Sequence, residues 1–198
     1  MKVVLVDSGG ANLGSVRYAL ERLGVAPVVS GDAAVIAGAD RVILPGVGAA
    51  APGMARLREL DLVPTLRGLD KPLLGICLGM QLLFESSEEG EVDCLGLLPG
   101  RVRRMRPAAG LRVPHMGWNR LDPRGRSPLL EGIPDGAQVY FVHGYAAPVD
   151  ANTIASSEHG DAFAAVVQRG KVAGAQFHPE RSAAFGARLL ANFIAQGL

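Results

Sequence analysis

A cysteine set between two glycines is the first feature of this sequence that indicates chemistry. Cys77 is the centre of the run Gly-Ile-Cys-Leu-Gly at 75–79. The apolar residues 72–76 predict a buried strand, and the Met, Gln and Leu residues of 78–84 predict a helix. The chain therefore turns abruptly at the cysteine, and the glycines on either side remove Cβ atoms that would clash there. This pattern is typical of a nucleophile elbow, in which serine usually takes the central position.

The start of the helix also favours a reactive thiolate at this position. Free N–H groups and the helix dipole stabilise negative charge at a helix N-terminus. A buried cysteine that acts only as a small hydrophobe is the commoner case for a lone cysteine. The flanking glycines favour the nucleophile instead.

A histidine and a glutamate follow another apolar run much later in the chain, at 174–180. Pro179 biases His178 towards an extended conformation, in which residues i and i+2 share a face. Glu180 can then hold one imidazole nitrogen while the other faces a thiol. A His-Pro-Glu tripeptide alone is often just a turn at a strand end. Together with Cys77, it predicts a triad of nucleophile, base and orienting acid.

A glycine-rich loop is the candidate for stabilising the oxyanion that forms when a thiolate attacks a carbonyl. Residues 41–44 read as a strand and run into Pro-Gly-Val-Gly at 45–48, whose glycines leave backbone amides uncovered. Each donor in an oxyanion hole typically contributes several kcal/mol. An ordinary turn is the alternative for this stretch taken alone. The predicted oxyanion hole consists of the amides of Gly46, Val47, Gly48 and Leu78.

Three of these segments resemble the signatures of the class I (triad-type) glutamine amidotransferases. They are Leu-Pro-Gly-Val-Gly at 44–48, Gly-Ile-Cys-Leu-Gly-Met-Gln at 75–81 and His-Pro-Glu at 178–180, in the order that the family shows. The resemblance implies a flavodoxin-like α/β fold and a glutaminase that releases glutamate and ammonia. It implies neither an organic cofactor nor a metal, and the four histidines show no zinc-site spacing.

Three further segments, at 12–16, 114–119 and 140–145, resemble one branch of that family, the glutaminase subunits of imidazole glycerol phosphate synthase. This likeness covers essentially the whole chain. It implies a heterodimer with a (β/α)₈-barrel cyclase subunit, which uses the ammonia to make imidazole glycerol phosphate and AICAR in histidine biosynthesis. The glutamine-binding residues that it implies are Gln81, Glu89, His143, Gly144 and Tyr145. The partner-interface residues that it implies are Asn12, Pro114, His115, Trp118, Asn119 and Arg181.

Three positions depart from the pattern of the resembled family. Ser8 stands where tyrosine is usual, Gly144 replaces serine or threonine, and Arg181 replaces lysine. Glycine at 144 should preserve a backbone contact with glutamine at some loss of rigidity. The fork-shaped guanidinium of Arg181 changes the geometry of any ion pair across the subunit interface. None of these changes touches the predicted triad.

The residues taken alone leave plainer alternatives open. Glu89 lies in the acidic run 88–91, which is typical of a solvated loop. Trp118 and Tyr140 are typical core residues, and Asn12 is a typical helix cap.

Three other functions also remain open. A glutaminase that feeds a different synthase is the nearest, and the segment 114–119 counts against it. A cysteine peptidase or thiol hydrolase of related fold would need no partner. A glutamine-binding regulator with an inactive triad is the alternative outside enzymes, and the intact Cys77, His178 and Glu180 count against it.

Composition favours a compact enzyme and excludes several classes of protein. The length of 198 residues suits one domain, which we place at 1–198. A net charge of +1 and 48% hydrophobic residues exclude a disordered chain and a general polyanion binder. The one basic run, 101–106, has no aromatic residue to stack a base, so nucleic acid is not expected as a partner. We expect this run at the outer edge of the sheet or near the partner interface.

The cysteines and the apolar runs indicate the compartment. Cys77 and Cys94 are the only cysteines, and without a secretory leader they indicate a reducing, cytoplasmic setting more than a disulfide. We expect Cys94 to be structural or at the surface. No apolar run approaches about 18 residues, so no membrane span is predicted.

Alternating strands and helices in the first half predict a central, mostly parallel sheet flanked by helices. Strands are expected at 2–7, 27–30 and 41–44, with an amphipathic helix at 12–23. Parallel sheets bind ligands at the carboxyl ends of their strands, so Gly46, Cys77 and His178 should converge at one edge.

The second half shows short strands between Pro/Gly turns, which predict antiparallel additions at an edge of the sheet. An alanine-rich helix at 182–196 closes the chain. The expected strands of this half lie at 138–142, 153–156, 163–168 and 171–177.

Overall fold

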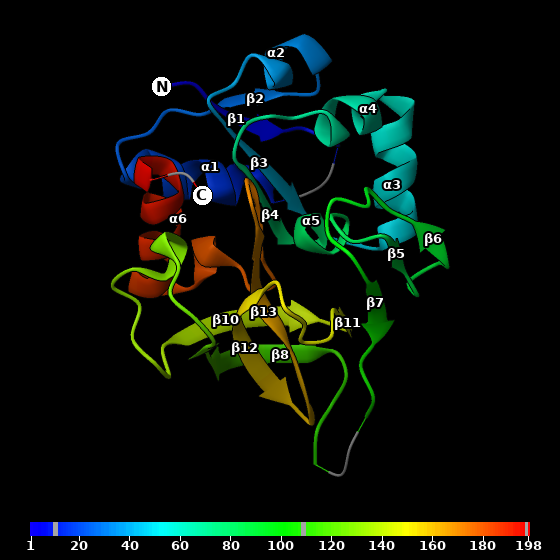
Figure 1. Ribbon diagram of the computed structural model, residues 1–198, viewed down its shortest axis with the longest axis vertical. Helices are drawn as coiled ribbons and strands as arrows, with labels where there is room; N and C mark the ends of the chain where they lie inside the picture. The colour runs from blue at the N-terminus through cyan, green and yellow to red at the C-terminus, as the bar shows by residue number, and fades with distance from the viewer. Residues whose placement is uncertain (10–11, 108–109, 197) are drawn as a thin grey trace.

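Eight strands form the main sheet of the computed structural model, which describes residues 1–9, 12–107, 110–196 and 198. Their order is β2-β1-β3-β4-β14-β13-β12-β9 (Figure 1). The first five are parallel to one another, and the last three are antiparallel additions. The strands are β1 (Val3–Val6), β2 (Val28–Ser30), β3 (Arg41–Gly46), β4 (Leu73–Cys77), β9 (Asp122–Pro123), β12 (Thr153–His159), β13 (Asp161–Arg169) and β14 (Val172–Ala175).

Helices cover both faces of this sheet, as the alternating pattern predicted. One buried cluster joins α1 and α6 to one face, and a second joins α2, α3 and α4 to the other. All five residues of β4 are buried between these layers. No helix among the described residues has the length and apolar character needed to cross a membrane. The helices are α1 (Leu13–Arg22), α2 (Ala33–Ala37), α3 (Ala50–Glu59), α4 (Leu62–Arg67), α5 (Leu78–Gln81) and α6 (Ala183–Gln196), with 3₁₀ turns η1 (Pro128–Leu130) and η2 (Pro179–Arg181).

The prediction of antiparallel edge strands is confirmed for β12 and β13 and is wrong for two other segments. β14 lies inside the sheet, parallel to β4, where its last three residues are buried, as expected for a strand covered on both faces. β10 (Gln138–His143) leaves the main sheet and pairs with β8 (His115–Arg120) in a sheet of two strands. Buried residues alternate along β10, so only one of its faces meets the core.

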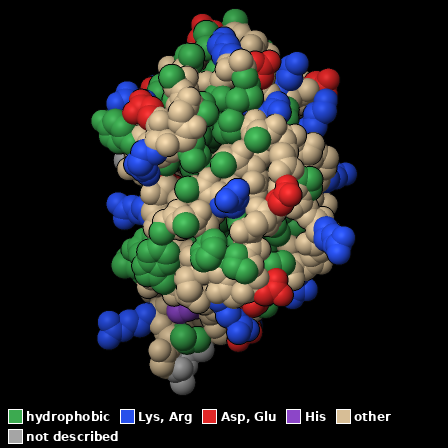
Figure 2. Space-filling view, turned by 90° about the vertical axis from the view of Figure 1, so that its left-hand side faces the viewer, with side chains coloured by type: hydrophobic (Ala, Val, Ile, Leu, Met, Phe, Trp, Pro, Cys, Tyr) green, Lys and Arg blue, Asp and Glu red, His purple; other side chains and the backbone are tan. Residues whose placement is uncertain are grey.

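The basic run does not lie at an edge of the main sheet. Its strand β7 (Arg101–Arg104) lies between β11 (Tyr145–Ala146) and β5 (Ser86–Ser87) in a small four-stranded sheet that ends with β6 (Val92–Asp93). Val102 is buried and the arginines are exposed. On the face in Figure 2, basic and acidic side chains are dispersed between hydrophobic patches and form no field of one sign.

The helix after the cysteine is shorter than predicted. It was expected over 78–84, but α5 ends at Gln81. The carbonyls of Leu82, Leu83 and Phe84 would accept bonds from the next turn, but amides of residues 95–98 bond to them instead. A tertiary contact therefore stops the helix after one turn.

Candidate active site

Cys77 lies at the junction of β4 and α5 in a conformation that side chains rarely adopt. Its φ is 53° and its ψ is −110°, which marks a strained turn of the nucleophile-elbow type. A Cβ at Gly75 would lie 2.6 Å from the carbonyl oxygen of Gly79, and a Cβ at Gly79 would lie 1.8 Å from that of Leu44. The two glycines are therefore required by close backbone contacts, as the sequence predicted.

Strand order brings the predicted site residues to one edge. β3 and β14 flank β4, and Gly46 pairs directly with Cys77. A cavity of about 180 Å³ lies at this edge, between the ends of these strands and the segment 142–145. The predicted convergence is confirmed, except that Gly46 lies beside the cavity and not in its wall. The lining residues are Val47, Gly48, Cys77, Leu78, Gln81, Glu89, Val142, His143, Gly144, Tyr145 and His178.

His178 and Glu180 form a buried pair behind this cavity. Nδ1 of His178 lies 2.7 Å from Oε1 of Glu180, and their side chains are 3% and 0% exposed. Burial alone lowers the pKa of His178, but Cys77 and Glu180 outweigh it and raise that pKa to about 10. Glu180 therefore orients a ring that holds its proton at neutral pH.

The second ring nitrogen of His178 is left for chemistry. Nε2 is buried and makes no hydrogen bond to the described residues, although His178 lines the cavity with Cys77. The thiol contacts the carbonyl oxygen of Val142 at 3.9 Å. Catalytic hydrogen bonds often become short only when substrate is bound. The arrangement therefore places a thiol nucleophile and an imidazolium proton donor in one cavity.

Two buried glutamines form the floor of the site. Nε2 of Gln81 donates to the carbonyl of Tyr145 at 2.9 Å and to Oε1 of Gln176 at 3.0 Å. Nε2 of Gln176 points at Sγ of Cys77 at 3.9 Å. The sequence pattern alone gave Gln176 no role. A signal was present, because this polar residue interrupts an apolar strand two positions before His178 and so shares its face.

Asn12 has a role that the sequence did not predict. It precedes α1 with φ 85°, but its side chain makes no capping bond. Instead, Nδ2 donates to Oε1 of Glu180 at 2.7 Å. Burial raises the pKa of Glu180, but the bonds from His178 and Asn12 outweigh it and hold that pKa below its ordinary value. Asn12 therefore supports the triad from behind.

Replacing Asn12 with glycine tests this role without straining the backbone, because glycine adopts positive φ freely. We expect kcat for the reaction at Cys77 to fall about tenfold, the usual effect of losing one hydrogen bond to a charged group. The pKa of Glu180 rises, so the acid limb of the kcat–pH profile moves to higher pH. Unchanged kcat and an unchanged profile would show that Asn12 is only structural.

Glu89 lies in the cavity wall and not in a fully solvated loop. Its side chain is half-buried, and Oε2 accepts the Ala50 amide at the start of α3 at 3.0 Å. Burial raises the pKa of Glu89, and the Ala50 bond only partly opposes this. A carboxylate in this position suits the ammonium group of an amino acid.

The segments predicted to form an oxyanion hole lie on two sides of the thiol. Val47, Gly48 and Leu78 line the cavity. Gly48 has φ +99°, and a Cβ at Gly46 would lie only 3.0 Å from the Gly79 amide. The loop therefore packs closely on the elbow, and its glycines are needed there.

The predicted interface residues divide into exposed and buried ones. Trp118 is 53% exposed, and Pro114 and Arg181 are exposed. His115 is only 4% exposed, and its predicted place in the partner interface stays a prediction. It is buried because its ring stacks on Phe141 with centroids 4.9 Å apart.

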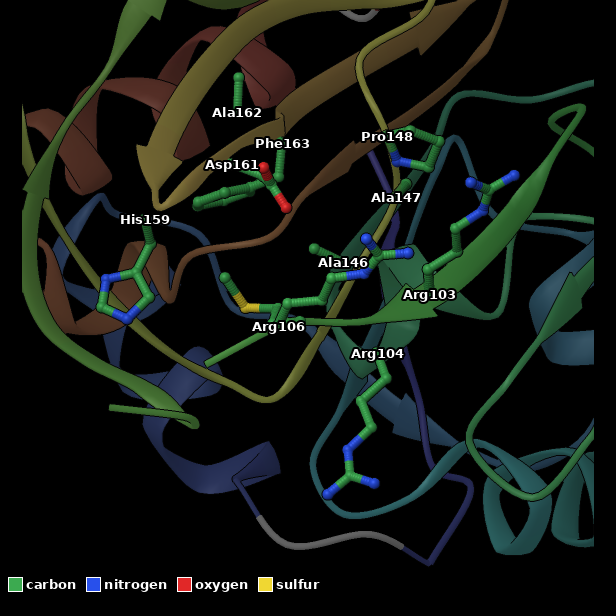
Figure 3. A pocket seen from close by; sticks show the side chains of 11 residues that line it. Arg103, Arg104, Arg106, Ala146, Ala147, Pro148, His159, Asp161, Ala162 and Phe163 are labelled. Atoms are coloured by element: carbon green, nitrogen blue, oxygen red, sulfur yellow. The ribbon is translucent and has the colours of Figure 1, made fainter. Parts of the chain in front are cut away.

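Of two further cavities, one borders Asn12 and Arg181 of this set. One of about 350 Å³ shares Val47, Val142 and His178 with the triad cavity and reaches Asn12, Ser15 and Arg181. Another of about 300 Å³ lies apart from the triad, below the β12–β13 hairpin, where the Arg103 and Arg104 side chains point in different directions (Figure 3). Among the described residues, no group of three or more His, Cys, Asp and Glu side chains is placed to hold a metal ion.

Comparison with known proteins gives consistent relatives. The family model for glutamine amidotransferase class-I matches residues 4–196. The imidazole glycerol phosphate synthase subunit HisH of Xanthomonas euvesicatoria pv. vesicatoria (strain 85-10) is 67% identical over 192 residues, covering 97% of this chain and 96% of the relative. The protein of the same description from Xylella fastidiosa (strain Temecula1) is 62% identical over 193 residues, covering 98% and 96%.

Solved structures share the fold at low sequence identity. A structure described as a glutamine amidotransferase superposes with a TM-score of 0.74 at 22% identity, covering 96% of each chain. A glutamine amidotransferase from Thermotoga maritima superposes with a TM-score of 0.61 at 19% identity, covering 98% of this chain and 82% of that one.

Proposed function

This chain belongs to the class I glutamine amidotransferases, in the branch of HisH subunits of imidazole glycerol phosphate synthase, and from this premise we propose how its residues work. The whole of 1–198 is one glutaminase domain that converts glutamine and water into glutamate and ammonia. The observation that carries the assignment of residues is the cavity lined by both Cys77 and His178, with Glu180 bonded to His178 behind it.

The first half of the reaction forms a thioester. The Cys77 thiolate attacks the side-chain amide carbon of glutamine, and its C=O bond opens to an oxyanion held by the amides of Val47, Gly48 and Leu78. His178 gives its Nε2 proton to the amide nitrogen. The C–N bond then breaks, ammonia leaves, and a γ-glutamyl thioester remains on Cys77.

The second half restores the enzyme. His178, now neutral, takes a proton from a water molecule that attacks the thioester carbonyl. The C–S bond breaks, glutamate leaves, and the thiolate–imidazolium pair forms again. Glu180 keeps the ring in one orientation through both halves, because its 2.7 Å bond fixes Nδ1.

Glutamine fits the wall of the cavity opposite the triad. The carboxylate of Glu89 suits the substrate ammonium group, and backbone groups of 143–145 suit its carboxylate and its reacting amide. Gln81 stabilises this wall through its 2.9 Å bond to the Tyr145 carbonyl. These roles accord with the cavity lining.

Ammonia requires a partner, because it is useful only if it reaches an acceptor before escaping into water. We propose that this partner is a cyclase subunit with a (β/α)₈-barrel fold. The cavity near Asn12 and Arg181 meets the triad cavity at Val47, Val142 and His178. It offers ammonia a route from the triad to the surface beside Asn12 and Arg181. The free thiols of Cys77 and Cys94 suit the reducing, cytoplasmic setting expected from the sequence.

Trp118 is the proposed anchor of the partner interface. Its ring is half exposed and packs edge-on against Tyr140 at 6.0 Å, and exposed tryptophans are enriched among interface hot spots. We expect Trp118→Ala to weaken binding of the cyclase by about 30-fold or more, measured by titration calorimetry.

Charge reversal of Arg103 and Arg104 tests the separate prediction that the basic run lies near the partner. Unchanged affinity for the cyclase would exclude that prediction.

Glutamate release from glutamine tests the whole assignment. The purified chain is assayed alone and with a barrel cyclase plus its nucleotide ligand, and Cys77→Ala serves as the blank. We expect activity mainly with the liganded cyclase, because Gly46 and Gly48 allow the loop to reorient when the acceptor site is filled. Full activity without the partner would refute this gating, and activity indifferent to the cyclase would point to another acceptor.

A further inference from the structure

Three histidines from three neighbouring strands gather beside the glutamine pocket. His115 on β8 lies directly opposite His143 on β10 in the strand register. The ring of His159, at the end of β12, stacks on that of His115 with centroids 4.2 Å apart. His159 also borders the separate cavity of Figure 3. His115 and His143 are buried, so their ring nitrogens need partners inside the protein.

The hydrogen bonds determine the proton positions on both buried rings. Nδ1 of His143 lies 2.9 Å from the Tyr145 carbonyl oxygen, which only accepts, so Nδ1 carries the proton. Nε2 of the neutral ring is then an acceptor, and it faces Nδ1 of His115 at 3.0 Å. Nδ1 of His115 must therefore also carry its proton.

Asn119 completes this series of hydrogen bonds at its outer end. Its Nδ2 lies 3.3 Å from Nε2 of His115 and 2.8 Å from the Glu158 carbonyl oxygen. Its Oδ1 accepts the Arg120 amide at 2.8 Å, which fixes the orientation of the side-chain amide. Every bond from Asn119 through the two rings then runs in one direction.

Both rings stay neutral in this environment. Burial lowers the pKa of His115 to about 4, and the neighbouring His159 adds to that effect. Burial lowers the pKa of His143 to about 3, against the opposing bond to the Tyr145 carbonyl. Neutral rings are required, because an imidazolium has no acceptor nitrogen and would break the chain.

We propose that Asn119, His115 and His143 are positioning residues, whose directed hydrogen bonds hold the Tyr145 carbonyl and so fix the backbone wall of the glutamine pocket. The Tyr145 carbonyl also accepts from Gln81, which bonds to Gln176 beneath the Cys77 thiol. The chain thus connects the floor of the active site to β8. This proposal rests on the proposed glutaminase function.

The position of Asn119 suggests a second role for this series of hydrogen bonds. Asn119 follows Trp118, the proposed anchor for the cyclase, on the same strand. A shift of β8 when the partner binds would change the Asn119–His115 bond first and the Tyr145 carbonyl last. The partner therefore has a direct hydrogen-bonded connection to glutamine binding.

Matched variants of the buried rings separate positioning from packing. His115→Leu removes the donor, and His115→Asn keeps an N–H near the position of Nδ1. His159→Leu is the control, because His159 stacks on His115 but bonds to the Arg112 carbonyl instead. We expect His115→Leu in the cyclase complex to raise KM for glutamine about tenfold with little change in kcat, because the wall binds substrate and transition state alike. His115→Asn should restore most of the affinity, and His159→Leu should leave KM unchanged.

Two outcomes would overturn the proposal: equal effects of His115→Leu and His159→Leu, or a fall in kcat alone. If His115→Leu does not fold, Asn119→Leu removes the first donor from a half-exposed position and should raise KM in the same way. An unchanged KM in that variant would also count against the proposal.

Nitrogen NMR of the histidine rings provides a readout independent of activity. Spectra of the ¹⁵N-labelled chain should show the Nδ1–H tautomer for His115 and His143, both still neutral at about pH 5. Either ring as the Nε2–H tautomer, or titrating near its ordinary pKa, would refute the chain of bonds. If the tautomers are as expected but no glutamine is hydrolysed, the proposed function fails and the hydrogen-bonded chain stands.

Discussion

Replacing Cys77 with alanine abolishes glutamine hydrolysis, lowering kcat by on the order of 10⁴-fold or more, and leaves the fold intact. Loss of a nucleophile costs this much in comparable triads, because the remaining groups supply only binding and oxyanion stabilisation. The fold survives because alanine keeps the Cβ that already tolerates φ 53°, and only one sulfur atom is removed from the cavity. The measurement is glutamate release by the cyclase complex, with circular dichroism to check the fold.

The second cysteine provides the matched control for this prediction. Cys94 is 1% exposed, and burial raises its pKa to about 11, so its thiol stays neutral and unreactive. Cys94→Ala should therefore keep the full rate and lose only about 1 kcal/mol of stability from the small cavity. Iodoacetamide should label Cys77 and spare Cys94. A Cys77→Ala enzyme that kept more than about 1% of the rate would exclude Cys77 as the nucleophile.

The elbow was predictable from the sequence because its steric requirements are local. Gly75, Cys77 and Gly79 lie within five positions, and their backbone contacts explain the pattern directly. The pairing of His178 with Glu180 was predictable from their spacing, but the expected extended segment was wrong: Glu180 lies in the 3₁₀ turn η2, where its carboxylate reaches Nδ1 of His178. The parallel strands of the first half, with helices on both faces, followed from strand–helix alternation.

The supporting residues were not predictable, because they act across long separations in the chain. Asn12 and Glu180 are 168 positions apart, and Gln81 and Gln176 are 95 apart. A helix-capping pattern around Asn12 does not predict its contact with the Glu180 carboxylate, which lies on η2. Only the order of the strands places these side chains together.

Tertiary contacts also overruled local patterns in two elements. The apolar periodicity after Cys77 suited a longer helix, but the loop 95–98 takes the carbonyls that would continue it. The alternating pattern of β10 was correctly extended, yet its partner is β8 and not the main sheet. The two-residue period of apolar side chains identifies a strand and its buried face. Which strand it pairs with depends on the strand edges that the rest of the fold leaves available.

The second large effect concerns the glycine that lets α5 approach β3. Gly79→Ala would place a Cβ 1.8 Å from the carbonyl oxygen of Leu44 and 2.8 Å from its carbon. Both are backbone atoms of a buried central strand, so neither can move aside as a side-chain end can. We expect the free energy of unfolding to fall by about 3–5 kcal/mol, and the melting temperature by roughly 10 °C.

The activity of the folded Gly79→Ala protein should fall further than its stability implies. Moving α5 away from β3 displaces the Leu78 amide and the Cys77 thiol together, and an error of about 1 Å in a catalytic group costs about 100-fold. Gly125→Ala is the matched control, because a Cβ there meets no atom within 4 Å, and it should keep both stability and rate. Calorimetry and glutamate release at a temperature where both variants are folded separate the two effects. If Gly79→Ala melted and turned over like Gly125→Ala, the close contact of the elbow with β3 would not be what holds the nucleophile in place.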